Sequence, residues 1–276
     1  MPELPEVETV KNKLKKMVQG KTIIDVNILY PGMIEYPNVL EFKRQITGET
    51  ILDIKRRGKW LMFELDHYYL LSHLRMEGKY LIRSIKDPYE KHEHVEFVFS
   101  DQTTLRYKDV RKFGRMYLYP NEEVWNHKPL NELGLEPWDK LLNENYLKEK
   151  YSKKKLPIKT VLLDQSIIVG IGNIYADEIL FMSQIDPLKP CNLLTNEELK
   201  NIINNNKIVL EHAIELGGTT IRSYESSEGV HGLFQNELFV HGQTICKKCG
   251  SKIIKTKVNG RGTYYCPKCQ DNVNKK

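Results

Sequence analysis

Long hydrophobic runs are missing from this 276-residue sequence: none approaches the ~20 apolar residues that cross a bilayer. The first residues, Met1 to Glu6, include two acids and lack the apolar core of a secretory signal. We therefore expect neither membrane insertion nor secretion, and place the protein in the cytoplasm. Internal repeats and low-complexity tracts are also lacking, whereas hydrophobic residues reach 40%, enough to bury a core in two or three modules.

The net charge of the chain is small, but positive charge is concentrated at its C-terminal end. The formal net charge is +6, yet residues 244–276 alone carry nine Lys or Arg and a single acid, Asp271. The rest of the chain therefore sums to −2. A near-neutral body with a basic end indicates either a polyanion-binding appendage or a solvated lysine-rich tail, and charge alone does not separate the two.

Cysteines are few, and four of the five fall in this basic segment. Two C-x2-C pairs with sixteen residues between them are typical of a tetrahedral zinc site. Two disulfides are the alternative, which a chain without a secretion signal disfavours. We predict one structural Zn²⁺ and no small-molecule cofactor, with these ligands: Cys246, Cys249, Cys266 and Cys269.

The segment between the cysteine pairs is predicted to form a β-hairpin. Residues 256–258 and 263–265 have strand-like composition, and Asn259-Gly260 is a strong two-residue turn signal. Arg261 follows the turn, and its planar guanidinium suits phosphate. This pattern indicates a hairpin that contacts nucleic acid; the alternative is a zinc knuckle that only stabilises the fold.

Hydrophobic periodicity divides the remaining chain and predicts an α+β fold. It predicts a helix from Pro5 to Val18, followed by short strands without intervening helices, as in an antiparallel sandwich or barrel. We assign a first domain at 1–120, a connector at 121–158, a helical domain at 159–243 and a zinc finger at 244–276. The predicted strands are residues 22–30, 50–56, 60–65, 69–74, 94–100 and 103–107.

The helical domain has clear start and stop signals. Thr195 and Glu198 form a capping box for a helix that ends at Gly217-Gly218. An earlier helix begins near Gly172-Asn173 and runs through Phe181. Glycines at this start either serve capping or let backbone N–H groups approach a phosphate. Residues 217–232 lack periodicity and are predicted to form a mobile loop.

The amino-terminal residues have catalytic potential. Removal of Met1 would expose the secondary amine of Pro2, and an α-amino group has a pKa near ~8, low enough to be partly nucleophilic. Such an amine can attack a sugar C1′ and form an iminium, with Glu3 transferring protons. The alternative is that Pro2 and Pro5 only initiate the helix.

A resemblance bears on these alternatives. The run Pro2-Glu3-Leu4-Pro5-Glu6-Val7-Glu8-Thr9 resembles the start of bacterial formamidopyrimidine-DNA glycosylases, the enzymes that excise oxidised purines. The similarity covers essentially the whole chain. It continues through residues 57–60, 72–76, 91–95, 109–114, 170–178, 234–235 and 260–270. One departure is His241 and Gln243, where the family usually has Tyr and a basic residue.

The resemblance implies catalytic roles for four residues. Pro2 would displace the damaged base and form the Schiff base, while Glu3 would protonate the opening sugar. Lys59 would bind phosphate and assist β-elimination. Arg261 would grip the phosphates beside the lesion and assist δ-elimination.

The resemblance also implies an N-terminal β-sandwich, a helix–two-turn–helix domain and residues that contact DNA. Asn173 would hold a phosphate. Met76, Arg111 and Phe113 would fill the hole left by the extruded nucleotide, with Arg111 pairing the orphaned cytosine. Other positions match DNA contacts or the pocket: His92, Lys155, Glu6 and Glu178. Taken singly from the sequence, Met76 and Phe113 could equally be core residues and Arg111 part of a surface ion pair.

The sequence therefore predicts a monomeric bacterial base-excision repair enzyme, associated with the nucleoid, that acts on damaged double-stranded DNA. It would be a bifunctional glycosylase and abasic-site lyase for oxidised purines. One alternative is the related endonuclease VIII branch, which prefers oxidised pyrimidines, although Leu4, Arg111 and Phe113 favour the purine branch. The other is a non-catalytic zinc-finger DNA-binding protein.

Overall fold

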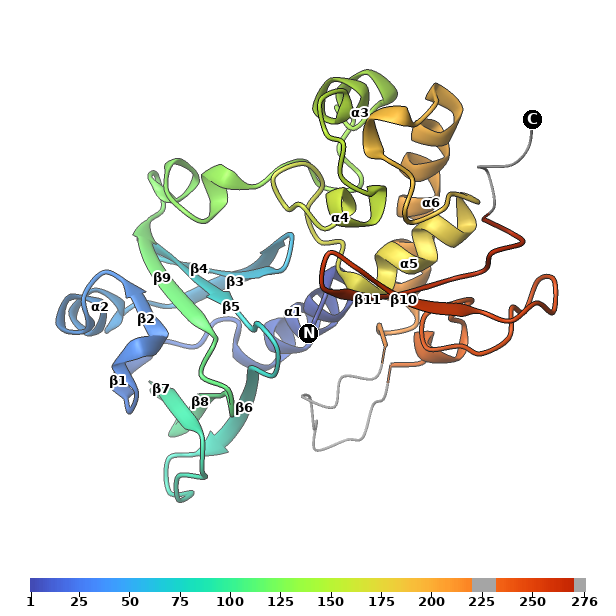
Figure 1. Ribbon diagram of the computed structural model, residues 1–276. Helices are drawn as coiled ribbons and strands as arrows, with labels where there is room; N and C mark the ends of the chain where they lie inside the picture. Colours follow the sequence, from blue (N-terminus) through green and yellow to red (C-terminus); the bar gives the residue numbers. More distant parts are fainter. Residues whose placement is uncertain (220–231, 271–276) are drawn as a thin grey trace. The chain divides into compact units, whose positions relative to one another are not determined.

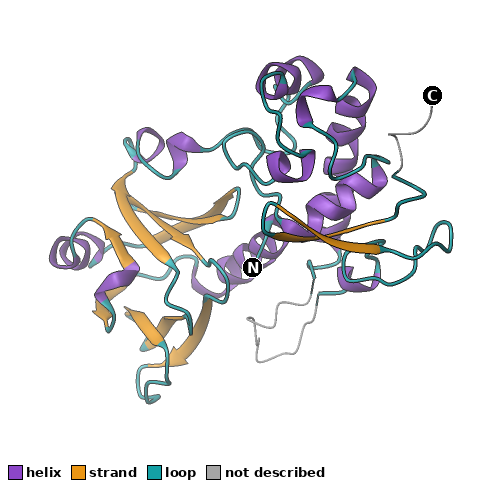
Figure 2. Cartoon of the chain, viewed as in Figure 1, coloured by secondary structure: helices purple, strands orange, loops and turns teal. Residues whose placement is uncertain are grey.

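The structure, a computed structural model, describes residues 1–219 and 232–270 (Figure 1). The chain forms two compact units: one contains residues 1–2 and 6–131, and the other contains residues 3–5, 132–219 and 232–270. Strands predominate in the first unit and helices in the second (Figure 2). In the described residues, no helix is both long enough and apolar enough to span a membrane.

Two sheets build the first unit. A four-stranded sheet has the order β1-β7-β8-β6, and a five-stranded sheet has the order β2-β9-β5-β4-β3. All neighbours are antiparallel except β2 and β9, which run parallel. The strands are β1 Ile23–Ile28, β2 Ile34–Tyr36, β3 Ile51–Arg57, β4 Trp60–Leu65, β5 Tyr68–His73, β6 Lys79–Ser84, β7 Glu93–Phe99, β8 Thr103–Lys108 and β9 Arg115–Pro120.

Both sheets and helix α1, Leu4–Val18, share one hydrophobic core. The apolar stripe of α1 is buried there because Val7, Val10, Leu14 and Val18 recur at helical spacing. A second helix, α2 (Val39–Ile46), begins at Asn38, whose side chain accepts from the backbone N–H of Glu41. The β-sandwich flanked by an N-terminal helix is therefore confirmed.

Four elements of this unit were not predicted from the sequence: β2, β6, β9 and α2. Strand β6 reads Lys-Tyr-Leu-Ile-Arg-Ser, with polar residues at both ends, and β2 is only three residues long. The Asn38–Glu41 spacing is the N-cap signal in the sequence that indicates α2. Each predicted strand has an observed counterpart, and the ends differ by at most two residues.

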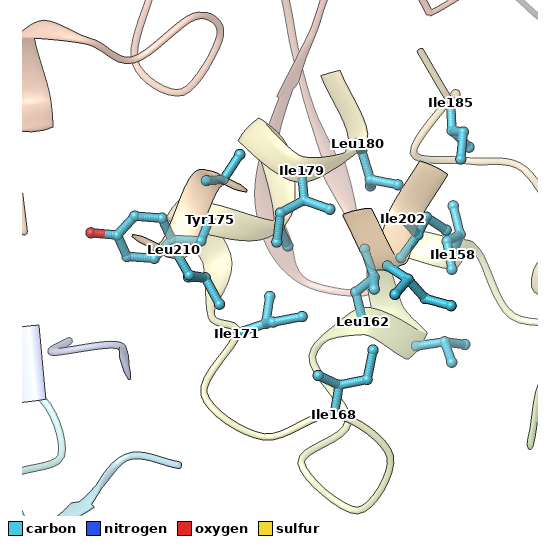
Figure 3. Close-up of a cluster of buried hydrophobic side chains, with 14 of the residues drawn as sticks. Ile158, Leu162, Ile168, Ile171, Tyr175, Ile179, Leu180, Ile185, Ile202 and Leu210 are labelled. Atoms are coloured by element: carbon cyan, nitrogen blue, oxygen red, sulfur yellow. The ribbon is translucent and has the colours of Figure 1, made fainter. Parts of the chain in front are cut away.

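Helices surround the core of the second unit, part of which Figure 3 shows. Ile158 and Leu162 come from α4, Tyr175 and Ile179 from α5, and Ile202 from α6. The predicted capping box of α6 is present, with both Thr195 and Glu198 engaged. The α-helices are α3 Glu144–Tyr151, α4 Ile158–Leu162, α5 Asn173–Met182 and α6 Asn196–Glu215, and the short 3-10 helices are η1 Pro31–Met33, η2 Val124–Asn126, η3 Leu130–Glu132, η4 Cys191–Leu193 and η5 Phe234–Asn236.

The predicted hairpin closes the second unit as β10, Ile254–Val258, and β11, Arg261–Tyr265. Asn259 and Gly260 have φ angles of 46° and 78°, the two positive values that a type I′ turn requires. Arg261 is the first residue of β11, directly after this turn. Most of the predicted mobile loop, residues 220–231, lies outside the described residues, and the exact domain boundaries stay a prediction.

Candidate functional site

The carboxylate of Glu3 is bound by the amino-terminal end of α5. Its Oε2 accepts from the backbone N–H of Gly172 at 2.7 Å and of Tyr175 at 3.3 Å, and Oε1 accepts from Ile174 at 2.9 Å. Glu3 is only 2% exposed. Three N–H donors and the positive end of the helix dipole thus face this carboxylate.

This arrangement explains the glycines at the start of α5. A Cβ on Gly172 would lie 2.3 Å from the Cδ of Glu3, and one on Gly170 would lie 2.3 Å from a methyl carbon of Leu4. The sequence left open whether the N–H groups here meet a phosphate. In the structure the N–H groups of residues 172, 174 and 175 are bound to Glu3 instead.

Asn173 lies where α5 meets the hairpin. Its Nδ2 donates to the carbonyl oxygen of Gly262 at 2.9 Å, while its Oδ1 is buried without a hydrogen-bond partner in the described part of the chain. Arg261 precedes Gly262 and is exposed. The structure thus brings together two residues predicted to hold phosphate, Asn173 and Arg261, on adjacent elements of one unit.

A buried charge cluster, which the sequence did not predict, supports this junction. Lys159 on α4 is fully buried and donates to the carbonyl oxygen of Asn173 at 2.7 Å and to Oδ1 of Asp177 at 2.5 Å. Burial lowers the pKa of Lys159, although Asp177 opposes that shift. The signal that could have revealed Lys159 is its position between Ile158, Val161 and Leu162, all buried.

The departure at His241 belongs to the same cluster. His241 donates from Nδ1 to Oδ2 of Asp177 at 2.6 Å, and its ring lies edge-on to Tyr264. The backbone N–H of Tyr264, on β11, also donates to Asp177 at 3.2 Å. In this chain, therefore, His241 helps join α5 to the hairpin.

The four predicted zinc ligands converge. All four Sγ atoms lie within 4.8 Å of one another, with 3.9 Å between Cys246 and Cys269 and 3.5 Å between Cys249 and Cys266. Zn–S bonds of about 2.3 Å in a tetrahedron separate sulfurs by about 3.8 Å, whereas a disulfide needs about 2.05 Å. The cysteines fit a zinc ion. Cys191, by contrast, is a buried thiol in the helical core.

In the first unit, Lys59 occupies the tight turn between β3 and β4. Gly58 before it has φ 55°, and Lys59 itself is 7% exposed. Nδ1 of the neighbouring His73 accepts a hydrogen bond from the backbone N–H of Arg75. Burial, with the charges of Arg75 and Lys59, lowers the pKa of His73 to about 3, so this imidazole is neutral at physiological pH.

Met76, Arg111 and Phe113 are predicted to fill the hole left by the extruded nucleotide. They lie on two loops, and all three are exposed. Met76, between β5 and β6, is 37% exposed, and Phe113, between β8 and β9, is 46% exposed. The Arg111 guanidinium lies 4.8 Å from the centre of the Phe113 ring. Exposed side chains of this kind are free to enter a duplex, and the alternative of core residues is therefore wrong for Met76 and Phe113.

The remaining predicted residues are spread over both units. His92 is half-exposed with φ 73°, and burial together with nearby lysines lowers its pKa. Lys155 is exposed, whereas Glu6 is buried. Glu178 is buried too: it accepts from the backbone N–H groups of residues 239–241, and burial raises its pKa.

Known proteins are similar to this chain over nearly its full length. The formamidopyrimidine-DNA glycosylase N-terminal domain matches residues 1–116, the H2TH domain of these enzymes matches residues 133–225, and the zinc finger found in FPG and IleRS matches residues 246–272. A formamidopyrimidine-DNA glycosylase of Oceanobacillus iheyensis is 53% identical over 99% of this chain and 98% of its own. The chain belongs to the formamidopyrimidine-DNA glycosylase family.

Solved structures agree with this family membership. A Lactococcus lactis Fpg in complex with DNA containing an abasic site has a TM-score of 0.90 and 42% identity, covering 98% of this chain and 100% of its own. A mutant of that enzyme bound to Fapy-dG DNA gives 0.91 and 41% over the same shares. The predicted family, the H2TH domain and the zinc finger are thereby confirmed.

Membership in the formamidopyrimidine-DNA glycosylase family defines the class of enzyme. The protein is a base-excision DNA repair glycosylase of a family that also has abasic-site lyase activity, and its C-terminal finger binds zinc. Neither the endonuclease VIII branch nor a non-catalytic DNA-binding protein is favoured. The roles of individual site residues stay predictions.

Proposed function

We propose that this protein excises 8-oxoguanine and formamidopyrimidines from duplex DNA and then cleaves the abasic strand by β,δ-elimination. The observation that carries the proposal is the Pro2-Glu3 start within a match to a formamidopyrimidine-DNA glycosylase over 99% of the chain. The bound DNAs of the Lactococcus relatives, abasic and Fapy-dG, support the substrate class.

The first step requires Pro2 as the amino terminus, after loss of Met1. Its neutral nitrogen forms a bond to C1′ while the glycosidic bond breaks, and the damaged base leaves with the bonding electrons and takes up a proton. Glu3 accepts a proton from the Pro2 ammonium and passes it to the ring oxygen as the sugar opens to an iminium. Three backbone N–H groups fix the position of the Glu3 carboxylate that transfers this proton.

Two eliminations then cut the strand. Loss of a C2′ proton breaks the C3′–O bond and releases the phosphate on the 3′ side. Loss of a C4′ proton then breaks the C5′–O bond and releases the phosphate on the 5′ side. Water hydrolyses the remaining iminium and regenerates Pro2. Lys59 and Arg261 stabilise the phosphate leaving groups, since charge-assisted hydrogen bonds to phosphate are strong.

The remaining predicted residues bind the DNA. The target nucleotide must leave the helix at a cost of about a few kcal/mol. Met76 and Phe113 replace the lost stacking, and Arg111 replaces the lost hydrogen bonds to cytosine. Asn173, with His92 and Lys155, contacts phosphates. We further propose one zinc ion per chain, a monomeric protein without an organic cofactor, and a cytoplasmic location at the nucleoid.

A trapping experiment tests the catalytic proposal. Borohydride should reduce the iminium on 8-oxoguanine DNA and give a covalent complex, with peptide mass spectrometry placing the adduct on Pro2. Intact mass should show that Met1 is absent. Pro2→Gly should reduce trapping by at least about tenfold, whereas Pro5→Ala, a matched change three residues away, should preserve it.

Two outcomes would contradict the proposal: no adduct with protein that has lost Met1, or an adduct on another residue. Substrate class is tested separately by excision of 8-oxoguanine and thymine glycol side by side. We expect faster excision of 8-oxoguanine. Faster excision of thymine glycol would favour the oxidised-pyrimidine alternative.

A further inference from the structure

We propose that Asp109 is the positioning residue for the loop that carries Arg111 and Phe113. Nothing in the catalytic chemistry calls for this carboxylate, yet it lies at the end of β8 and is only 1% exposed. The inference rests on the proposed function in one respect, namely that Arg111 and Phe113 enter the DNA.

The Asp109 carboxylate binds the backbone of the loop directly. Its Oδ1 accepts from the N–H of Arg111 at 3.0 Å, and its Oδ2 accepts from Phe113 at 2.9 Å and Gly114 at 2.8 Å. The N–H of Lys112 donates to the Asp109 carbonyl oxygen at 3.3 Å. Four consecutive N–H groups thus point at one residue, and they hold Lys112 at φ 57°, a conformation that residues other than glycine rarely adopt.

Asp109 is itself anchored to the strand that follows His92. Its N–H donates to the carbonyl oxygen of His92 at 3.0 Å, and its carbonyl oxygen accepts from Nε2 of the buried His94 at 2.8 Å. The loop with Arg111 and Phe113 is therefore fixed to the segment that presents His92, another predicted DNA contact.

Tyr107 provides a common floor for this loop and for the loop that carries Met76. A Cβ on Gly114 would lie 1.9 Å from the Tyr107 hydroxyl oxygen, and one on Gly78 would lie 2.1 Å from it. Gly78 closes the Met76 loop by donating its N–H to Leu74 at 2.9 Å. Both loops can pack on one phenol only because both glycines lack a side chain.

The exposed side chains of Arg111 and Phe113 are therefore attached to a loop whose backbone is already ordered. Phe113 and Arg111 have little packing above them, so without the carboxylate the loop would sample many conformations. Binding would then require ordering that loop, and apparent affinity falls by the fraction of molecules in the competent conformation. Asp109 removes that requirement before DNA arrives.

The test compares Asp109→Asn with Asp101→Asn. The control residue caps the β7–β8 turn in the same sandwich, where it accepts the Thr103 N–H at 3.0 Å. In DNA-free protein we expect Asp109→Asn to speed amide hydrogen exchange at residues 111–114 by at least about tenfold, because an amide retains only one acceptor oxygen. Asp101→Asn should leave those four amides protected. Continued protection in Asp109→Asn would overturn the inference.

The functional readout is preference for 8-oxoguanine opposite cytosine over adenine. Asp109→Asn should weaken this preference in the direction that Arg111→Ala does, while trapping on single-stranded abasic DNA stays near wild type. If Arg111→Ala loses the preference and Asp109→Asn keeps it, the positioning role is overturned. If Arg111→Ala keeps it, the proposed function of Arg111 fails, and hydrogen exchange still decides on Asp109.

A second pair of variants covers the case in which Asp109→Asn fails to fold. Gly114→Ala should raise exchange in the same loop, because its new methyl group meets the Tyr107 hydroxyl. Adding Tyr107→Phe removes that oxygen and should restore part of the protection. An unchanged loop in Gly114→Ala would contradict the inference, whereas rescue by Tyr107→Phe supports it.

Discussion

At the scale of single residues, the start of α5 can bind Glu3 only because Gly172 has no side chain. Gly172 leaves room for the Glu3 carboxylate, whose Cδ would be only 2.3 Å from an added Cβ. A larger residue must displace either Glu3 or the helix. The position of Glu3, the residue that follows the proposed nucleophile Pro2, thus depends on a residue 169 positions away.

We therefore expect Gly172→Ala to lower the single-turnover rate of base excision by about 10- to 100-fold. Destabilisation of about 1–3 kcal/mol is expected from the steric overlap alone. Gly134→Ala provides the control, because its Cβ would meet the backbone of Ile167, at 2.3 Å from the carbonyl oxygen, instead of the Glu3 side chain. It should lower thermal stability similarly and preserve the rate. Equal rate losses in the two variants would show that Glu3 is not involved.

Which site residues the sequence could predict follows from the range of their contacts. The zinc ligands were predictable because Cys246 and Cys249, and the second pair likewise, are close along the chain. Lys159 was not, since Asp177, the partner that defines it, becomes its neighbour only through folding. Local spacing carries no record of such contacts.

At the scale of elements, the zinc hairpin has only a small cluster of buried residues around its metal site. Its cluster of buried residues consists of two of the ligands, Cys246 and Cys266, with Phe181, Val240 and Ile253. Gln270 adds a clamp, accepting from the N–H of Cys266 and donating to the carbonyl oxygen of Ile185. So small a core is not expected to keep a hairpin folded without its ion.

Removal of zinc should therefore abolish DNA cleavage while leaving the β-sandwich folded. Chelation, or Cys246→Ser, frees the hairpin and breaks the contact between Asn173 and Gly262, so binding to abasic-site DNA should fall by at least about tenfold. Released zinc can be measured with a colorimetric chelator, and hydrogen exchange can report on each unit. Cys191→Ala is the control and should retain both metal and binding. Full activity in metal-free protein would contradict this expectation.

The elements that the sequence predicted well share strong local signals. The Asn259-Gly260 turn and the Thr195–Glu198 capping box are encoded within four residues, and both are present. Strand β2 is different: it pairs in parallel with β9 across about eighty residues. Its three residues carry too little pattern to stand out, and only that distant partner makes them a strand.

At the scale of the whole molecule, the modest net charge of +6 limits what non-specific attraction can contribute to binding. Affinity should instead depend on a few placed cations that displace counterions from phosphates. The logarithm of the binding constant falls with the logarithm of salt concentration by about 0.9 per phosphate contacted.

Lys155→Ala should accordingly reduce the magnitude of this salt slope by about 0.9, because Lys155 is exposed and is predicted to contact one phosphate. Lys200→Ala removes an exposed lysine of α6 and serves as the matched control, with no change in slope expected. Fluorescence anisotropy with abasic-site DNA across a salt series measures both. Indistinguishable slopes for the two variants would remove Lys155 from the set of contacts.

The hydrogen bond between Glu3 and Gly172, 169 positions later in the chain, has a consequence for biosynthesis. A ribosome adding about 5–20 residues per second makes Glu3 roughly ten to thirty seconds before Gly172. During that interval Glu3 lacks its hydrogen-bond partners at the start of α5, and enzymes that trim nascent chains can act before those contacts form. The order of synthesis thus gives Met1 time to be removed before folding fixes the residue that follows Pro2.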